Sequence, residues 1–184
     1  ENLTEEALTS VENNLFLAQL SSNNGGSFKS FYLKEYFDND SQRVNLINDQ
    51  TQTLFLELKT FEGDLLDLSS PWSLETYSIP DIIEDSLNLT YTKKILNKFS
   101  ISKTLTFFSD SYLILCEIDI SNVPRDLIGE NLIVSWLGGL KPTEKNIQDD
   151  HVYFQAYSFL GGEQEKFKVN ENKPELITFN GALD

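Results

Sequence analysis

The residues that could carry out catalysis are few and scattered along the chain. His151 is the only histidine, and it follows Asp149 and Asp150. A Ser-His-Asp triad could be drawn through it, but the sequence has no G-x-S-x-G motif or other context for a nucleophile. We therefore interpret His151 as an exposed residue where a loop meets a strand.

Carboxylates are plentiful, so a pair suited to acid and base catalysis could form without leaving a sequence signal. A glycosidase-type site needs two carboxyl groups about 5 to 9.5 Å apart, one of them desolvated enough to keep its proton. Glu57, Glu117 and Asp119 fall on the outward phase of their expected strands, which favours solvation. A carboxylate-pair hydrolase therefore stays an alternative only.

Cys116 is the only cysteine, which excludes an intramolecular disulfide and any multi-cysteine metal site. It is in phase with Tyr112, Ile114, Ile118 and Ile120 in an alternating segment. This spacing predicts a thiol that points into the core and is chemically inert.

One oxygen-rich turn could hold a cation. Asp38, Asn39 and Asp40, with Asp49 further on, offer the oxygen ligands that calcium accepts. The spacing does not match an EF-hand loop, and Asx residues that form an ordinary turn explain it equally well. Calcium is therefore a possible ligand, and no other cofactor is expected.

Four aromatic residues are candidates for ligand contacts: Trp72, Trp136, Tyr153 and Tyr157. Tyrosine and tryptophan combine a large apolar face with a polar tip, which suits stacking on a sugar or packing against a protein partner. Packing in the core is the alternative reading. Phosphate-binding glycine motifs are absent, so nucleotide binding is not supported.

The formal charge of −15 is concentrated in the first half of the chain, where residues 1–90 carry 16 acidic and 4 basic side chains. Such a field repels phosphate backbones and anionic lipid surfaces, so nucleic-acid binding is not expected. The one basic cluster comprises Lys93, Lys94, Lys98 and Lys103. Lysines on the exposed face of a strand are its ordinary explanation.

Composition and length predict one folded domain over residues 1–184, because 40% of the residues are hydrophobic and 12% are aromatic. The longest apolar run has no more than five residues, whereas a membrane-spanning helix needs about 20. We therefore expect no membrane insertion. The start at Glu1 and the lack of methionine favour a processed or excised fragment of a secreted or cell-surface protein.

Helical spacing over several residues is found near the start of the chain. Thr4 is a candidate N-cap, and Leu8, Val11, Leu15 and Ala18 recur at helical spacing, which predicts a short helix over residues 4–13. Most of the rest alternates with a period of two residues or is rich in β-formers. The expected strands lie at 15–20, 28–37, 44–48, 53–61, 72–79, 87–96, 102–109, 112–121, 131–137, 151–160, 166–169 and 175–179.

Strands at intervals of roughly 10 to 15 residues, without regular alternation of strand and helix, predict an all-β fold. An antiparallel β-sandwich with a short N-terminal helix fits best, and a calycin-like closed β-barrel is the alternative. Strand order and oligomeric state stay open.

No family resemblance guides the functional reading. We expect a noncatalytic binding or assembly module that acts through protein or carbohydrate contacts, because catalytic signatures are missing and the chain is acidic. A β-barrel carrier of a small apolar ligand is a second hypothesis, motivated by the aromatic-rich strands. Assembly through an exposed strand edge also fits the pattern.

Overall fold

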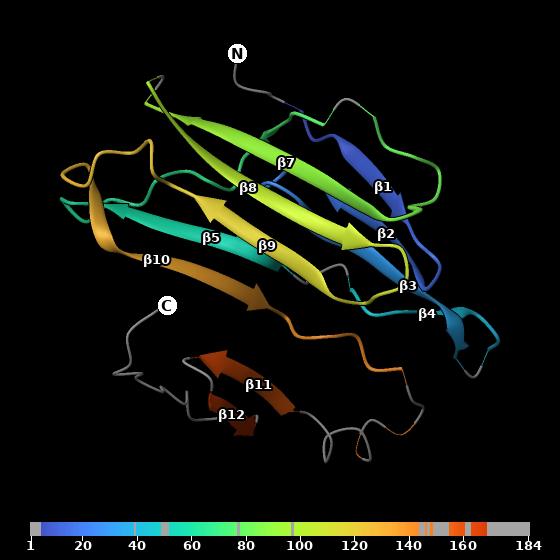
Figure 1. Cartoon of the computed structure of the whole chain (residues 1–184). Coiled ribbons are helices and arrows are strands. Elements are labelled where there is room, and N and C mark those ends of the chain that lie inside the picture. The colour runs from blue at the N-terminus through green and yellow to red at the C-terminus, as the bar shows by residue number, and fades with distance from the viewer. Residues whose placement is uncertain are drawn as a thin grey trace. The chain divides into compact units, whose positions relative to one another are not determined.

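The computed structural model is built mainly of β-strands joined by turns in the part of the chain that it describes (Figure 1). That part comprises residues 5–38, 40–48, 52–76, 78–96, 98–143, 146, 148, 155–160 and 163–168. The strands are β1 (Leu8–Glu12), β2 (Phe16–Ser21), β3 (Ser27–Phe37), β4 (Arg43–Asn45), β5 (Gln52–Thr60), β6 (Ser73–Leu74), β7 (Ser86–Ile95), β8 (Phe99–Phe108), β9 (Ile114–Asp119), β10 (Ile128–Leu137), β11 (Gln155–Leu160) and β12 (Glu163–Lys168).

The chain divides into two compact units, residues 1–143 and 144–184. The first unit holds two antiparallel four-stranded sheets, in the orders β1-β2-β3-β4 and β6-β7-β8-β9, and the antiparallel pair β5-β10. In the second unit, β11 and β12 form an antiparallel hairpin that pairs Gln155 with Lys168 and Leu160 with Glu163. One domain over residues 1–184 stays a prediction.

The core of the first unit lies between its two four-stranded sheets. Alternate residues of β8 are buried, among them Ile101, Leu105 and Phe107. The ring of Phe107 lies 6.3 Å from that of Phe16 on β2 and 6.4 Å from that of Phe28 on β3, measured between centroids. These contacts join the inner faces of the two sheets, so the predicted β-sandwich is confirmed. The alternative of a closed barrel is not, because both sheets are open in the described residues.

The turn between β2 and β3, residues 22–26, packs against the inner face of β7 and β8. Gly25 and Gly26 have φ of 63° and 90°, a region that side-chain-bearing residues rarely adopt. A Cβ atom on Gly25 would lie 2.7 Å from the ring of Trp72, and one on Gly26 would lie 2.6 Å from the ring of Tyr91. Only glycine lets the backbone approach these rings so closely.

The predicted helix over residues 4–13 is wrong in its described part, where β1 forms instead. β1 pairs with β2 from Leu8 opposite Ser21 to Glu12 opposite Leu17. This pairing satisfies the backbone groups along one edge of β2 and buries Val11. Tertiary pairing therefore outweighs the helical spacing of the apolar residues.

Most predicted strands are present with shifted ends. The segment at 72–79 shortens to the two residues of β6, and the segment at 131–137 belongs to the longer β10. Residues 151–154 of one expected strand, and all of the strand expected at 175–179, lie outside the described residues.

Candidate functional site

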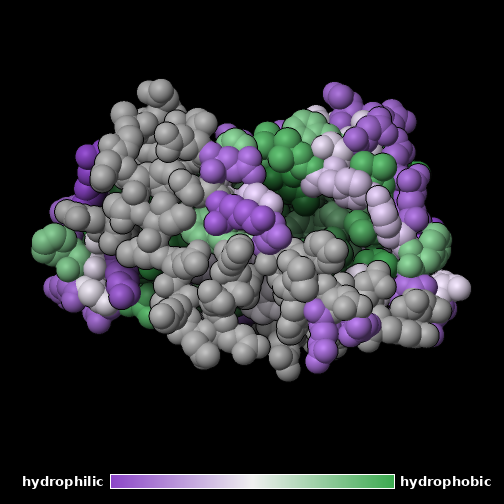
Figure 2. Space-filling view, turned by 90° about the horizontal axis from the view of Figure 1, so that it is seen from below, coloured by the Kyte–Doolittle hydropathy of each residue, from purple (hydrophilic) through white to green (hydrophobic). Residues whose placement is uncertain are grey.

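An apolar groove of about 530 Å³ opens on the surface of the first unit. Apolar side chains gather at a hollow in the surface in Figure 2. The groove is lined by residues of β3, β5, β9, β10 and the segments next to them: Phe28, Phe31, Leu33, Tyr36, Leu46, Ile47, Leu54, Tyr112, Ile114, Cys116, Trp136 and Leu140. Its polar atoms are confined to two phenol groups, one thiol, one indole N–H and the backbone.

Aromatic rings form one wall of the groove. Phe31 stacks on Phe16 at 4.4 Å and meets Phe28 edge-on at 5.7 Å, and Phe28 lies 6.4 Å from Trp136. Because Phe16 and Phe28 belong to the core, this wall is continuous with the interior and is held firmly. Trp136 and Leu140 remain 44% and 56% exposed. The groove therefore offers a preformed apolar surface to water.

Two outer strands flank the groove. β9 is the last strand of its sheet, and β10 pairs only with β5 among the described strands. The alternation of β10 places Leu132 and Val134 opposite Leu58 and Leu56 of β5. Val134 nevertheless stays 49% exposed, whereas Leu56 and Leu58 are buried. The sandwich is thus incompletely covered on this side.

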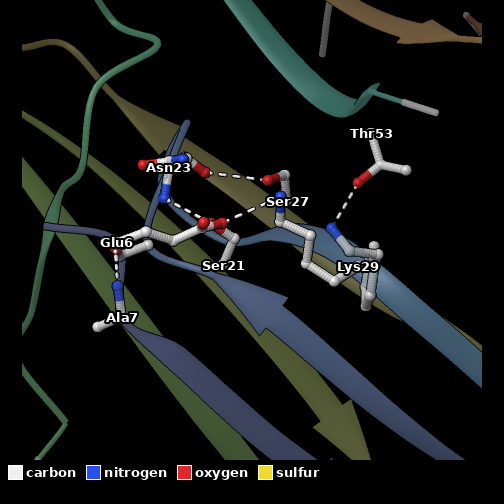
Figure 3. Close-up of polar contacts among 9 residues, drawn as sticks. Glu6, Ala7, Ser21, Asn23, Ser27, Lys29 and Thr53 are labelled. Atoms are coloured by element: carbon white, nitrogen blue, oxygen red, sulfur yellow. Dashed lines mark hydrogen bonds and ion pairs between the residues drawn. The ribbon is translucent and has the colours of Figure 1, made fainter. Parts of the chain in front are cut away.

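The wall formed by β5 contains an irregularity of the backbone. Leu54 has φ of 52°, and the register with β10 shifts between the pairs Ser135–Phe55 and Leu137–Gln52. Such a shift is a β-bulge, which redirects side chains locally. The N–H of Phe28 donates to Thr53 Oγ1 at 2.6 Å in this bulge. Thr53 and the dashed line from its hydroxyl oxygen are seen in Figure 3.

Two lysines of the basic cluster are buried, contrary to the prediction that they lie on an exposed face. Lys103 Nζ donates to the carbonyl oxygen of Leu54 at 2.8 Å and lies 5.8 Å from the centre of the Trp72 ring. Lys93 Nζ donates to Ser70 Oγ and to the carbonyl oxygen of Pro71, at 2.6 and 3.1 Å. Both lysines alternate in phase with apolar residues, so the inner faces of β7 and β8 carry them inward.

Cys116 lines the groove and is exposed, so the prediction of a core thiol is wrong, although Ile114 and Ile118 on the same face do pack against the core. Its sheet ends at β9, and no described strand covers it there. Desolvation raises the pKa of the thiol, and the nearby charge of Lys103 opposes this shift. At neutral pH the group is therefore a neutral thiol, which makes it a weak nucleophile.

Two carboxylates lie near the groove. The charge of Glu35 contributes, after desolvation and Tyr36, to raising the pKa of the Tyr112 phenol, and that of Glu117 acts in the same direction on Cys116. Both glutamates are exposed. Lys141, which follows Leu140 and donates its backbone N–H to the carbonyl oxygen of Leu46, adds an exposed positive charge nearby, so the surroundings of the groove carry both signs of charge.

The four predicted aromatic contact residues have separate positions. Trp136 is in the groove, whereas Trp72 is fully buried and donates its indole N–H to the carbonyl oxygen of Leu68 at 2.9 Å. A ligand in solvent cannot reach the Trp72 ring. Tyr157 is exposed on β11 of the second unit beside Lys166, and Tyr153 lies outside the described residues.

The predicted calcium turn is held by its own hydrogen bonds. Asp38 Oδ1 accepts the N–H groups of Asp40 and Gln42, each at 2.9 Å, as an ordinary Asx turn does. Asn39, Asp149, Asp150 and His151 lie outside the described residues. Within the described part of the chain, no group of three or more metal-binding side chains comes together. Calcium stays a prediction.

Sequence reasoning missed most of the groove. Leu33, Leu46, Leu54 and Leu140 are ordinary apolar residues in four separate segments, and no spacing rule relates them. Of the four predicted aromatic contact residues, Trp136 on β10 is the one that lines the groove.

Fold and groove together define an antiparallel β-sandwich with an open apolar groove. Residues 8–174 match the family described as the YidC periplasmic domain, and the chain belongs to this family. No helix in the described residues is long and apolar enough to span a membrane. No solved structure matches the chain.

Relatives with curated names carry the name membrane protein insertase YidC. The protein of Chlorobium luteolum is 31% identical over 173 residues, which cover 91% of this chain and 29% of that protein. The protein of Prosthecochloris aestuarii is 29% identical over 171 residues, with the same two coverages. The chain thus spans less than a third of the length of these relatives, which are named as insertases rather than as enzymes.

These matches correct the functional reading of the sequence. The prediction of a secreted or cell-surface binding module for protein or carbohydrate partners is wrong, as are its carrier and hydrolase alternatives, because the family is a domain of a membrane insertase. The prediction of no membrane insertion is also wrong, because the relatives are named membrane protein insertases. The family is described as a periplasmic domain and its relatives are named membrane protein insertases, which corrects the predicted secreted or cell-surface location. The composition of this chain led to the wrong functional prediction because the chain aligns with only 29% of the length of these relatives.

Proposed function

We propose that this chain is the periplasmic part of a membrane protein insertase, and that its groove holds apolar segments of membrane proteins during insertion. The observation that carries the proposal is an apolar groove of about 530 Å³ that is open to solvent. Membership in the YidC periplasmic domain family supports the location.

The groove suits an apolar client for a thermodynamic reason. The lining residues Trp136 and Leu140 are about half exposed, and covering such side chains removes apolar surface from water. A client segment that has not yet entered the lipid bilayer exposes apolar surface of its own. Mutual burial is favourable, and the openness of the groove allows release.

The proposed role is noncatalytic. The groove contributes two phenols, one indole N–H and a thiol whose pKa is raised by desolvation, so binding and release are what its chemistry supports. No covalent step is needed to hold an apolar segment.

Site-specific photocrosslinking tests this proposal. A photoreactive phenylalanine analogue replaces Trp136 in the complete insertase, and a defined membrane protein is synthesised in its presence. The matched control carries the analogue at Ile82, which is 48% exposed and does not line the groove. We expect a crosslink to the nascent membrane protein from position 136 and not from position 82. Equal crosslinking from both positions, or equal capture of a secreted protein without apolar spans, would refute it.

A further inference from the structure

Lys103 is a charged residue in a place where an apolar residue would fit. It is fully buried on the inner face of β8, in phase with Ile101 and Leu105. Burying an ammonium group is costly unless partners replace its hydration. Its partners here are the carbonyl oxygen of Leu54, at 2.8 Å, and the ring of Trp72. The position of the Leu54 carbonyl group therefore depends on the hydrogen bond from Lys103.

Leu54 itself has an unfavourable backbone conformation. Its φ of 52° lies in the left-handed region, where the Cβ atom of an L-residue crowds its own backbone. Surrounding contacts must enforce this conformation. These contacts come from both sheets. The N–H of Phe28 on β3 donates to Thr53 Oγ1, and the ammonium group of Lys103 on β8 donates to the carbonyl oxygen of Leu54.

The same bulge shapes the groove. The side chains of Leu54 and Phe28 both line it, so the hydrogen bonds that hold the bulge also set the positions of two lining residues. A charged donor holds a carbonyl oxygen more firmly than a neutral one does. An apolar residue at position 103 would leave that oxygen without its donor.

We propose that Lys103 is a positioning residue for the groove: its buried ammonium holds the β5 bulge that places Leu54 in the groove wall. The proposal rests on the proposed function for what the groove binds, but the effect of Lys103 on the bulge can be measured without any client.

Lys93 provides a matched control. It is also buried, at 7% exposure, and its ammonium also donates to a carbonyl oxygen. Its partners Ser70 and Pro71 do not line the groove. Replacing Lys93 removes a comparable buried charge without touching the bulge.

The experiment compares Lys103→Met and Lys93→Met in the 184-residue chain. Amide hydrogen exchange at residues 53–56 reports on the bulge, and the fluorescence of the neutral apolar dye Nile red reports on the groove. For K103M we expect faster exchange at these amides and roughly tenfold weaker dye binding, as expected for loss of one charge-assisted contact. For K93M we expect both readouts to stay within about twofold of the original chain.

Both readouts must change together in K103M. Unchanged exchange at residues 53–56, or changed exchange with unchanged dye affinity, would overturn the proposal. If the original chain does not bind Nile red, the proposed function fails, while the exchange data still decide whether Lys103 holds the bulge. If K103M does not fold, Leu54→Gly is added, because glycine adopts the left-handed conformation freely. Restored folding in the double variant would support the proposal that Lys103 holds the bulge. A double variant that also fails to fold would overturn it.

Discussion

The turn between β2 and β3 and the apolar groove differ in which side chains they bury and which they expose. Around the turn, polar groups such as Ser21, Asn24 and Lys103 are buried. In the groove, apolar groups such as Trp136 and Leu140 are half exposed. The turn fills the interior and contributes to stability, whereas the groove leaves apolar surface uncovered for a partner. The comparison predicts that changes at the turn cost stability and that changes in the groove cost binding.

The largest effect is expected for Gly25→Ala. The new Cβ atom would meet the Trp72 ring at 2.7 Å, in a backbone conformation that disfavours any side chain. Strain and overpacking together predict a loss of about 4 kcal/mol in the free energy of unfolding, measured with urea. Gly63→Ala is the control, since Gly63 also has positive φ but has nothing within 4 Å of the new atom. It should cost only about 1 kcal/mol, and equal losses would show that the close approach to Trp72 is unimportant.

Lys103 gives a smaller effect, which depends on pH. Desolvation lowers the pKa of Lys103 from 10.5 to about 8, so between these values the unfolded chain binds the extra proton. Stability from this group therefore rises as pH increases from about 8 to 10.5, by about 3 kcal/mol in total.

Urea unfolding across this pH range tests the effect. The difference between the chain with Lys103 and K103M isolates it from the titration of other lysines and tyrosines. Both variants should carry Cys116→Ser, because the charges of Cys116 and Lys103 act on each other. A difference that stays constant with pH would contradict the lowered pKa.

The alternation of residues in the sequence predicts the sandwich well where strands are long and regular. β7 and β8 pair without interruption from Ser86 opposite Phe108 to Ile95 opposite Phe99, and their buried faces follow the predicted period of two. β1 was predicted as a helix, because its apolar spacing fits both structures and only pairing with β2 decides between them.

The groove could not be predicted in the same way. Its lining residues come from strands that the fold brings together over long separations, such as Phe28 on β3 and Trp136 on β10. Lys103 shows a second limit, since its position in the alternation indicated the inner face of β8 while its charge favoured solvent. The hydrogen bond to Leu54 resolves that conflict, and it depends on a bulge that the sequence does not signal.

The smallest effect on stability is expected for Trp136→Ser. The ring is 44% exposed, and its indole N–H donates only a long hydrogen bond of 3.3 Å to Gly139. The free energy of unfolding should change by less than about 1 kcal/mol, while Nile red binding weakens. A large loss of stability with unchanged dye binding would place Trp136 in the structural core instead.

The central claim, that the groove receives apolar client segments, is tested most directly by amide NMR of the 184-residue chain during titration with a lysine-flanked leucine peptide. The account predicts that shift changes gather on β3, β5, β9 and β10 around the groove and that a serine-for-leucine version of the peptide causes almost none. Changes spread over the acidic surface and equal for both peptides, or gathered away from the groove, would contradict it.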